Sequence, residues 1–417
     1  MTLPADAQRS RAAAFVDAVT VYFRPRVLIV LLLGFSSGLP LALSGETLTV
    51  WMADNGVDIG TIGLFALVSL PYTIKFLWAP IVDALHVPWL TQRLGRRRGW
   101  LVATQLLLMA AILFLGTRDP VGAPLAVALG AALVAFVSAT QDIVIDAYRV
   151  ESLPTDEQAA GMASYVAAYR VGQLVSVAGL IGLAAWLEGH SLGKAVVWPI
   201  AFAVAAALVV VGLIAVLLAR EPEDGDARTE AETRADAITR VFRTAWGAFA
   251  DFLTRDVAIV VLIFVVFYKM CDALAGRMTA PFVLELGYDK GAYAAIVKGV
   301  GFAAALVGGG LVGGAIARTM PLAGALWLGA ILQMASNLVF VWLYFQPVSN
   351  WALSAAILVE NFAGGIGTVV FVAYLSALCR NPLHTATQYA LLTALALLAW
   401  LQRRGHFAPL DAVRNGK

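Results

Sequence analysis

Eleven long apolar stretches follow one another through almost the whole chain, separated by short polar loops. An α-helix needs about 20 mostly apolar residues to cross roughly 30 Å of hydrocarbon, where it satisfies its own backbone hydrogen bonds. The composition agrees, because 60% of the residues are hydrophobic and 13% are charged, against roughly a half and a quarter in soluble domains. The sequence therefore predicts an all-α, polytopic membrane protein with spans at 27–52, 61–82, 100–117, 124–147, 158–186, 194–219, 257–281, 290–317, 321–345, 350–379 and 384–401.

The basic residues of the loops fall almost wholly on alternate sides of these spans. With residues 1–26 placed in the cytoplasm, the outside loops hold only Arg118, Lys194 and Lys290. Lys and Arg accumulate in cytoplasmic loops, so we expect a multi-pass inner membrane protein with a cytoplasmic N-terminus. The first 26 residues show no cleavable signal pattern, so the first span is expected to stay in the membrane. The net charge of +2 gives no indication of nucleic-acid binding.

A polar segment, residues 220–256, divides the spans into an N-terminal half of six helices (27–219) and a C-terminal half of five (257–401). Six helices, a long cytoplasmic link and a second helical set are typical of major facilitator transporters, in which two halves rock about a central site. The second part of the link predicts an amphipathic helix on the cytoplasmic membrane surface, the alternative being a helix docked on the bundle. Its apolar residues at helical spacing are Ile238, Val241, Phe242, Ala245, Trp246, Phe249, Phe252 and Leu253.

Charged residues inside the spans are the strongest functional candidates. Each costs about 2.5–3.5 kcal/mol at the bilayer centre even on lenient scales, so each is expected to face a partner or water. These residues are Glu46, Lys75, Asp142, Asp146, Arg170, Lys269, Asp272, Arg277, Lys298 and Glu360.

Asp142, Asp146 and Arg149 share one face of the fourth span, toward its cytoplasmic end. One interpretation is a salt-bridged inner gate. The other is proton coupling, since two carboxylates one turn apart favour protonation of one of them, and the deeper Asp142 is the candidate. Glu360 in the tenth span and Glu46 in the first are further candidates for proton coupling, the alternative for Glu360 being a neutral, hydrogen-bonded acid.

Three spans carry residues suited to a charged solute. Arg170, beside Tyr169 in the fifth span, suits a carboxylate through a forked contact, and its alternative role is to pair with Asp142 or Asp146. Lys269 and Asp272, three residues apart, either neutralise one another or bind a zwitterionic ligand. Lys298 in the eighth span is a further cation for the solute.

The loop between the second and third spans carries an acid and a basic run. Asp83 ends the second span, and the third is preceded by Arg96, Arg97 and Arg98. We expect an Asp–Arg network and a helix dipole to hold an inward gate shut here, together with Arg149.

With these residues identified, the chain resembles the muropeptide permease family (AmpG type) of major facilitator transporters, from about residue 21 to about residue 395. The resemblance implies proton-driven import of anhydromuropeptides, GlcNAc-anhydroMurNAc peptides, from periplasm to cytoplasm in a Gram-negative bacterium. It rests on the stretches GFSSGLPLAL (34–43), TIGLFALVSLPYTIKFLWAPIVD (61–83), GRRRGW (95–100), SATQDIVIDAYRVESLP (138–154), YRVG (169–172) and HTATQYALLTAL (384–395).

The chemistry of such a solute suits the residues named above. Its carboxylates would meet Arg170, Lys269 and Lys298, and its amine would meet Asp272. Aromatic faces suited to stacking on sugars are Tyr169, Tyr72, Trp51 and Tyr268. We expect a monomer that uses no cofactor or metal.

The end of the chain departs from the family pattern. Residues 402–417 form a polar tail where a twelfth helix is expected, and the tail is basic on the side where other loops are not. The sequence therefore predicts a permease impaired by loss of its last helix, the alternative being an intact variant with eleven helices.

Three other functions compete with this one. A major facilitator transporter of another bulky anionic solute, such as an acyl-CoA, is the nearest. A membrane-embedded enzyme is disfavoured because the four histidines, His86, His190, His384 and His406, lie at span ends, in loops or in the tail. A sensor that transports nothing is the third.

Overall fold

The computed structural model describes residues 20–154, 157–222, 237–254, 258–289, 293, 295–379 and 384–401, and each predicted apolar stretch falls on a helical segment. Among the described residues, nine helices are long and apolar enough to cross a membrane. The seventh span contributes a shorter apolar helix, Ala258–Tyr268, within the described residues. The eleventh span is a helix of 17 residues.

The N-terminal half begins with a 3-10 turn, η1 (Val21–Phe23), and α2 (Pro25–Ala42), which continues through a π-helical turn, η2 (Leu43–Thr47), into α3 (Leu48–Asp54). The second span is broken into short helices because Pro71 and Pro80 interrupt its backbone hydrogen bonds. Its segments are α4 (Ile59–Leu64), η3 (Phe65–Ser69), α5 (Leu70–Ile74), η4 (Lys75–Leu77) and α6 (Ala79–Ala84). The rest of this half comprises α7 (Leu90–Leu94), α8 (Arg96–Gly116), α9 (Pro124–Ser152), α10 (Gln158–Leu174), η5 (Val175–Gly179), α11 (Leu180–Gly189), α12 (Lys194–Leu208) and α13 (Val210–Leu218).

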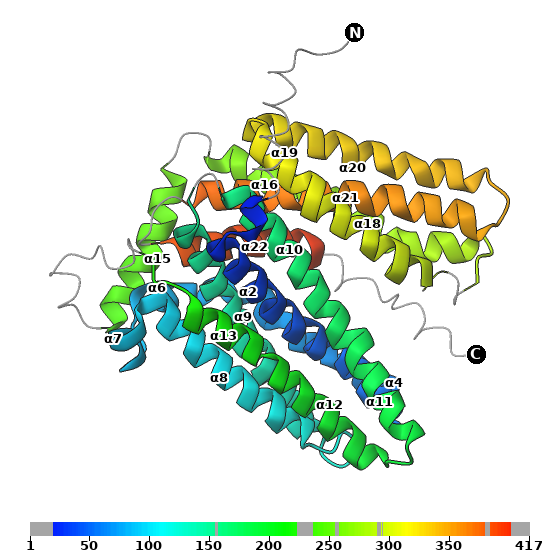
Figure 1. The fold of residues 1–417 in the computed structure, drawn as a ribbon, viewed down its shortest axis with the longest axis horizontal. Helices are drawn as coiled ribbons and strands as arrows, with labels where there is room; N and C mark the ends of the chain where they lie inside the picture. The colour runs from blue at the N-terminus through cyan, green and yellow to red at the C-terminus, as the bar shows by residue number, and fades with distance from the viewer. Residues whose placement is uncertain are drawn as a thin grey trace, which may run out of the picture.

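The second half follows a helix of the link, α15 (Ala237–Leu253). Its spans are α16 (Ala258–Glu285), then the run η7 (Val297–Gly301), α18 (Phe302–Leu306), η8 (Val307–Gly313) and α19 (Gly314–Thr319), then α20 (Leu322–Tyr344), α21 (Asn350–Leu378) and α22 (Thr385–Leu401). In Figure 1 the two halves lie together at the end where α6, α15 and α22 are found, and they diverge toward the opposite end. We call the first the closed end.

Contacts between the halves come from α10 and α22. Helix α10 packs on α19, α21 and η8, and α22 packs on α5, η4, α6 and α9. Near the start of the chain, the Tyr22 hydroxyl donates to the carbonyl of Gly310, 3.0 Å away, in the opposite half. The elements of the N-terminal half that contact the other half are therefore η1, α10, α5, η4, α6 and α9.

Glycines allow two pairs of spans to approach backbone to backbone. A Cβ at Gly34 or Gly38 of α2 would collide with the carbonyl of Tyr165 or Tyr169 on α10. A Cβ at Gly308 of η8 would collide with the carbonyl of Phe362 on α21. Such small residues replace hydrophobic association between membrane helices by close van der Waals packing.

The closest of these approaches predicts a position where a side chain is not tolerated. We expect Gly38→Val to reduce stability by about 1–3 kcal/mol, because the added atoms force α2 from α10. Gly182→Val on α11 is the matched control, since a Cβ there meets no atom within 4 Å. Thermal unfolding in detergent measures both, and equal melting temperatures for the two variants would contradict this packing.

Candidate functional site

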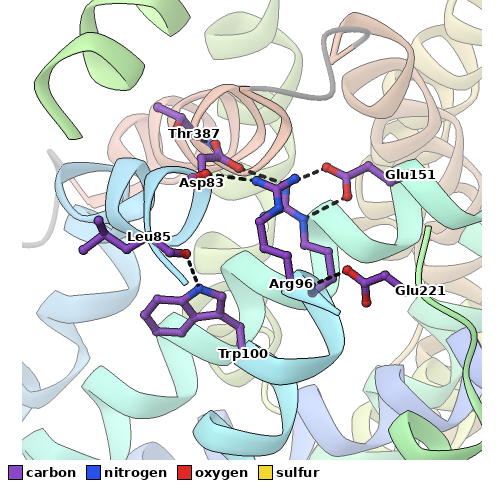
Figure 2. Close-up of polar contacts among 8 residues, drawn as sticks. Asp83, Leu85, Arg96, Trp100, Glu151, Glu221 and Thr387 are labelled. Carbon is purple, nitrogen blue, oxygen red and sulfur yellow. Dashed lines mark hydrogen bonds and ion pairs between the residues drawn. The ribbon is translucent and has the colours of Figure 1, made fainter. Parts of the chain in front are cut away.

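The buried carboxylate of Asp83 joins the two halves at the closed end. Asp83 lies in the last turn of α6 and is 0% exposed. One carboxylate oxygen accepts from Arg97 Nη2 at 2.9 Å. The other accepts from the backbone amide of Thr387 at 2.8 Å and from its hydroxyl at 2.7 Å. Figure 2 shows the Asp83 side chain directed at Thr387, which lies in the opposite half.

The amide that Asp83 accepts from belongs to the first turn of α22. Amides in the first turn of a helix have no partner within the helix, and they carry the positive end of the helix dipole. Thr387 is the third residue of α22, so a carboxylate from the N-terminal half caps a helix of the C-terminal half. A buried carboxylate of one half thus faces the positive end of a helix dipole in the other half.

Arg97 holds Asp83 in place from the other side. Its guanidinium also donates to both carboxylate oxygens of Glu151 at the end of α9, at 2.8 and 2.5 Å. The side chains of Arg97 and Asp83 are fully buried, and that of Glu151 is 4% exposed. A buried cation shared by two carboxylates ties α6, α8 and α9 into one unit, because each partner left alone would be an uncompensated buried charge.

Arg96 and Arg98 act within the N-terminal half. Arg96 Nη1 donates to the backbone carbonyl of Asp83 at 3.0 Å. Arg98 donates to the carbonyls of Val216 and Leu217 at the end of α13, at 3.0 and 3.1 Å. Both cations therefore cap helix C-termini, and the contacts of Arg98 with α13 place it away from the junction between the halves.

Glu221 is a member of this network that the sequence did not reveal. Its carboxylate accepts from the backbone amides of Arg97 and Arg98, at 2.7 and 3.0 Å, and so caps the first turn of α8. Burial raises the pKa of Glu221 above its ordinary value, while the two amides and the nearby guanidinium groups act in the opposite sense. Gly95 precedes this turn with a φ of 93°, and a Cβ there would collide with Glu221.

A second ionic cluster surrounds Asp146, which lies on α9 five residues before Glu151. Asp146 is 3.6 Å from Lys75 Nζ on η4 and 3.3 Å from Arg149 Nη2 on its own helix. The guanidinium of Arg149 lies between two rings, 4.7 Å from that of Tyr165 on α10 and 5.0 Å from that of Tyr389 on α22. Asp146 is thus paired with two cations, and Arg149 contacts both halves.

Asp142 has a different environment from Asp146. It is 7% exposed and accepts from the Ser37 hydroxyl of α2 at 2.5 Å. The Ser37 hydroxyl is in turn 3.0 Å from that of Tyr165. Among the described residues, the ion pairs within 4.0 Å include Asp146 but not Asp142. Asp142 is therefore held by a hydroxyl group, whereas Asp146 is held by two cations.

Three aromatic residues predicted to stack on sugars are placed in packed interiors. Trp51 is 2% exposed, with its ring 4.8 Å from that of Phe202. Tyr268 stacks on Phe371 at 4.9 Å and 7°. Tyr72 is 7% exposed within the core of the N-terminal half. Their faces are covered by protein in this conformation, so their burial does not support the prediction that they contact a solute.

The remaining candidates occupy several spans. Tyr169 and Arg170 are half-buried on α10, and Glu46 is exposed in η2. Glu360 on α21 is half-buried and accepts from the side-chain amide of Asn361 at 2.6 Å. The side chains of Lys269, Asp272 and Lys298, and all of residues 402–417, lie outside the described residues.

Comparison with known proteins identifies the family. The profile of the Major Facilitator Superfamily matches residues 22–401. The chain is 41% identical to the anhydromuropeptide permease of Escherichia coli K12 over 377 residues, which are 90% of this chain and 72% of that protein. The chain belongs to the AmpG family of major facilitator transporters. A protein named as an AmpG-type transporter in Rickettsia conorii is 35% identical over 373 residues, 89% of this chain and 87% of the relative.

Solved structures confirm the fold at much lower identity. A proton:xylose symporter bound to 6-bromo-6-deoxy-D-glucose aligns with a TM-score of 0.61 and 15% identity, over 91% of this chain and 87% of that one. The transporter FucP in its outward conformation aligns with a TM-score of 0.62 and 13% identity, over 91% and 89%. The prediction of an all-α, polytopic membrane protein of the major facilitator type is confirmed.

The Asp83–Thr387 contact predicts a specific effect of removing one hydroxyl. We expect Thr387→Val to weaken the closed end by about 1.5–3 kcal/mol, because it removes a hydrogen bond to a buried charge and keeps the side-chain shape. Spin labels at the exposed residues Gln92 and Thr319, in a background without Cys271 and Cys379, report the separation of the halves by pulsed EPR. The longer distances should gain population by at least about tenfold.

The matched control is Thr393→Val on the same helix. The Thr393 hydroxyl donates to the carbonyls of Tyr389 and Ala390 in its own helix, so this change leaves the junction intact. If both variants gave the wild-type distance distribution, Asp83 would not be holding the closed end through this hydroxyl.

Proposed function

We propose that this protein is a secondary transporter that imports anhydromuropeptides, GlcNAc-anhydroMurNAc peptides, across the inner membrane of a Gram-negative bacterium. The observation that carries the proposal is the 41% identity, over 90% of the chain, with the anhydromuropeptide permease of Escherichia coli. The transporter is a monomer with its N-terminus in the cytoplasm, and inward movement of protons drives the uptake that supplies cell-wall recycling.

The closed end is the cytoplasmic gate in this proposal. The loops there carry Arg93, Arg96, Arg97 and Arg98, in agreement with the accumulation of basic residues on the cytoplasmic side. The buried contacts of Asp83 with Arg97 and Thr387 support a conformation closed to the cytoplasm. Inward release of the solute then requires α22 to leave the Asp83 carboxylate.

In this proposal the solute contacts cations and an anion carried by spans of both halves. Arg170 and Tyr169 on α10 provide a forked donor and an aromatic face. Lys269, Asp272 and Lys298 come from the spans of the C-terminal half that stand opposite in the transporter fold. Together they match a solute with several carboxylates and one amine.

Asp142 is the carboxylate that we propose for proton coupling. It is buried, it accepts a hydrogen bond from Ser37, and its neighbour Asp146 carries the ion pairs with Lys75 and Arg149. Protonation and release at Asp142 therefore need not break a salt bridge. One proton moving down 100 mV supplies about 2.3 kcal/mol, which corresponds to a concentration ratio on the order of 50. Glu360 and Glu46 are the other carboxylates to be tested for this role.

Uptake by inverted and right-side-out vesicles tests the function directly. Vesicles with this chain should accumulate labelled GlcNAc-anhydroMurNAc-tripeptide when the outside is acidic and the inside negative, and an uncoupler should reduce accumulation to equilibration. Unlabelled solute should compete, while an acyl-CoA should not. Uptake of the acyl-CoA without uptake of the muropeptide would replace this proposal by the other bulky anionic solute.

Neutralising Asp142 should separate coupling from binding. We expect Asp142→Asn to abolish gradient-driven accumulation, at least about tenfold below wild type, while exchange of labelled for unlabelled solute across the membrane continues. Asp54→Asn is the control, because Asp54 pairs with Lys194 and Trp198 away from the cluster. Gradient-driven uptake at the wild-type rate in Asp142→Asn would assign coupling to another carboxylate.

A further inference from the structure

Helix α15 of the link presents two opposed kinds of surface. Five large apolar side chains, spaced by three or four residues, lie on one face and are between 39% and 81% exposed: Ile238, Phe242, Trp246, Phe249 and Leu253. A neighbouring face carries Ala248 and Phe252, one turn apart and each 2% exposed. The helix is thus docked by one face while a second apolar face remains open.

The docked face lies across the gate. Helix α15 packs on α6 of the N-terminal half and on α22 of the C-terminal half. The side-chain amide of Gln388 donates to Asp251 Oδ2 of α15 at 2.6 Å and lies 3.5 Å from the carbonyl of Ala248. Close packing extends to Gly247, where a Cβ would come within 2.9 Å of His384 Nε2.

Two adjacent residues of α22 therefore have hydrogen-bond partners on different helices. Thr387 is bonded to Asp83 at the end of α6, and Gln388 is bonded to Asp251 of α15. Since α15 also packs on α6, it spans the same two elements that the Asp83 carboxylate joins. Separation of α22 from α6 must then displace α15 from at least one of them.

The position of the open apolar face indicates what covers it. Leu253 precedes the first residue of α16 by five positions, and five residues span at most about 18 Å. Helix α15 must therefore lie near the membrane surface from which α16 starts. Arg240 and Arg243 lie on the same helix outside the apolar stripe, as in helices that bind anionic interfaces.

We propose that α15 is a membrane-anchored strap across the cytoplasmic gate. Its stripe of Ile238, Phe242, Trp246, Phe249 and Leu253 is buried in the lipid interface, and the contacts of its docked face with α22 and α6 favour the closed gate. The bilayer is thus a binding partner of the gate, and opening requires α15 to shift along or leave the lipid surface. The cytoplasmic assignment of this end rests on the proposed function, while the strap does not depend on which solute is carried.

Nitroxide labels along α15 test the lipid contact in full-length protein reconstituted in vesicles of phosphatidylethanolamine and phosphatidylglycerol. Labels at Phe242 and Trp246 should be relaxed by oxygen, which concentrates in lipid. Labels at Arg243 and Thr254 should be relaxed by an aqueous nickel chelate. Equal exposure of all four to the chelate would overturn the proposal. If labels at Phe242 and Trp246 were protected from both reagents, the apolar face would be covered by a protein partner or by a second copy of this chain. That result would also overturn the proposal.

The spin-label pair at Gln92 and Thr319 tests the strap. Trp246→Glu weakens the lipid contact, and Asp251→Asn weakens the hydrogen bond to Gln388. We expect each variant to increase the open population several-fold. Thr254→Glu adds the same charge at an exposed position off the stripe and should leave it unchanged. Phe242→Gln is a milder second variant should Trp246→Glu not fold.

A label at Ile238 decides between the outcomes. If Trp246→Glu releases this label into water while the gate distances stay as in wild type, the strap is refuted. Because the distance readout needs no solute, a failure of muropeptide uptake would leave this result unaffected.

Discussion

The junction of the two halves depends on one buried carboxylate that bonds a cation and a helix terminus at once. Asp83 would be prohibitively costly to bury alone. Arg97 compensates its charge from within the same half, and the first turn of α22 compensates it from the other half. The closed conformation is therefore the one in which this carboxylate has all its partners. Any conformation that moves α22 away must replace two donors by water.

This arrangement divides the ionic residues into two classes. Arg97, Glu151, Arg98 and Glu221 bond within the N-terminal half, so they keep their partners whatever the halves do. Thr387, Gln388 and Tyr389 are consecutive on α22, and each contacts a different group: the Asp83 carboxylate, Asp251 of α15 and the Arg149 guanidinium. One half can therefore move against the other by exchanging the partners of this strip of α22 and the contacts of α10, while the bonds within the N-terminal half stay intact.

The sequence predicted the spans because apolar length is a one-dimensional property, and it predicted the Asp83 and Arg97 network because the loop brings both residues together. It did not predict Thr387 or Glu221, since their partners are distant in sequence and a threonine or a glutamate at a span end has no distinctive spacing. The sequence indicated how deep Trp51 and Tyr268 lie along their spans. It did not indicate in which direction each side chain points around the helix axis. Both side chains face packed interiors, Trp51 beside Phe202 and Tyr268 against Phe371.

The pairing of Arg149 with two rings has a consequence for the energy of separating the halves. One ring, Tyr165, belongs to the same half as the arginine, and the other, Tyr389, belongs to the opposite half. A guanidinium is weakly hydrated and flat, so it exchanges an aromatic face for a layer of water at small cost. If Tyr389 withdrew, water would contact one side of the Arg149 guanidinium, while Tyr165 and Asp146 would remain on the other side. The halves can therefore separate here without leaving a buried charge that has neither water nor a protein partner.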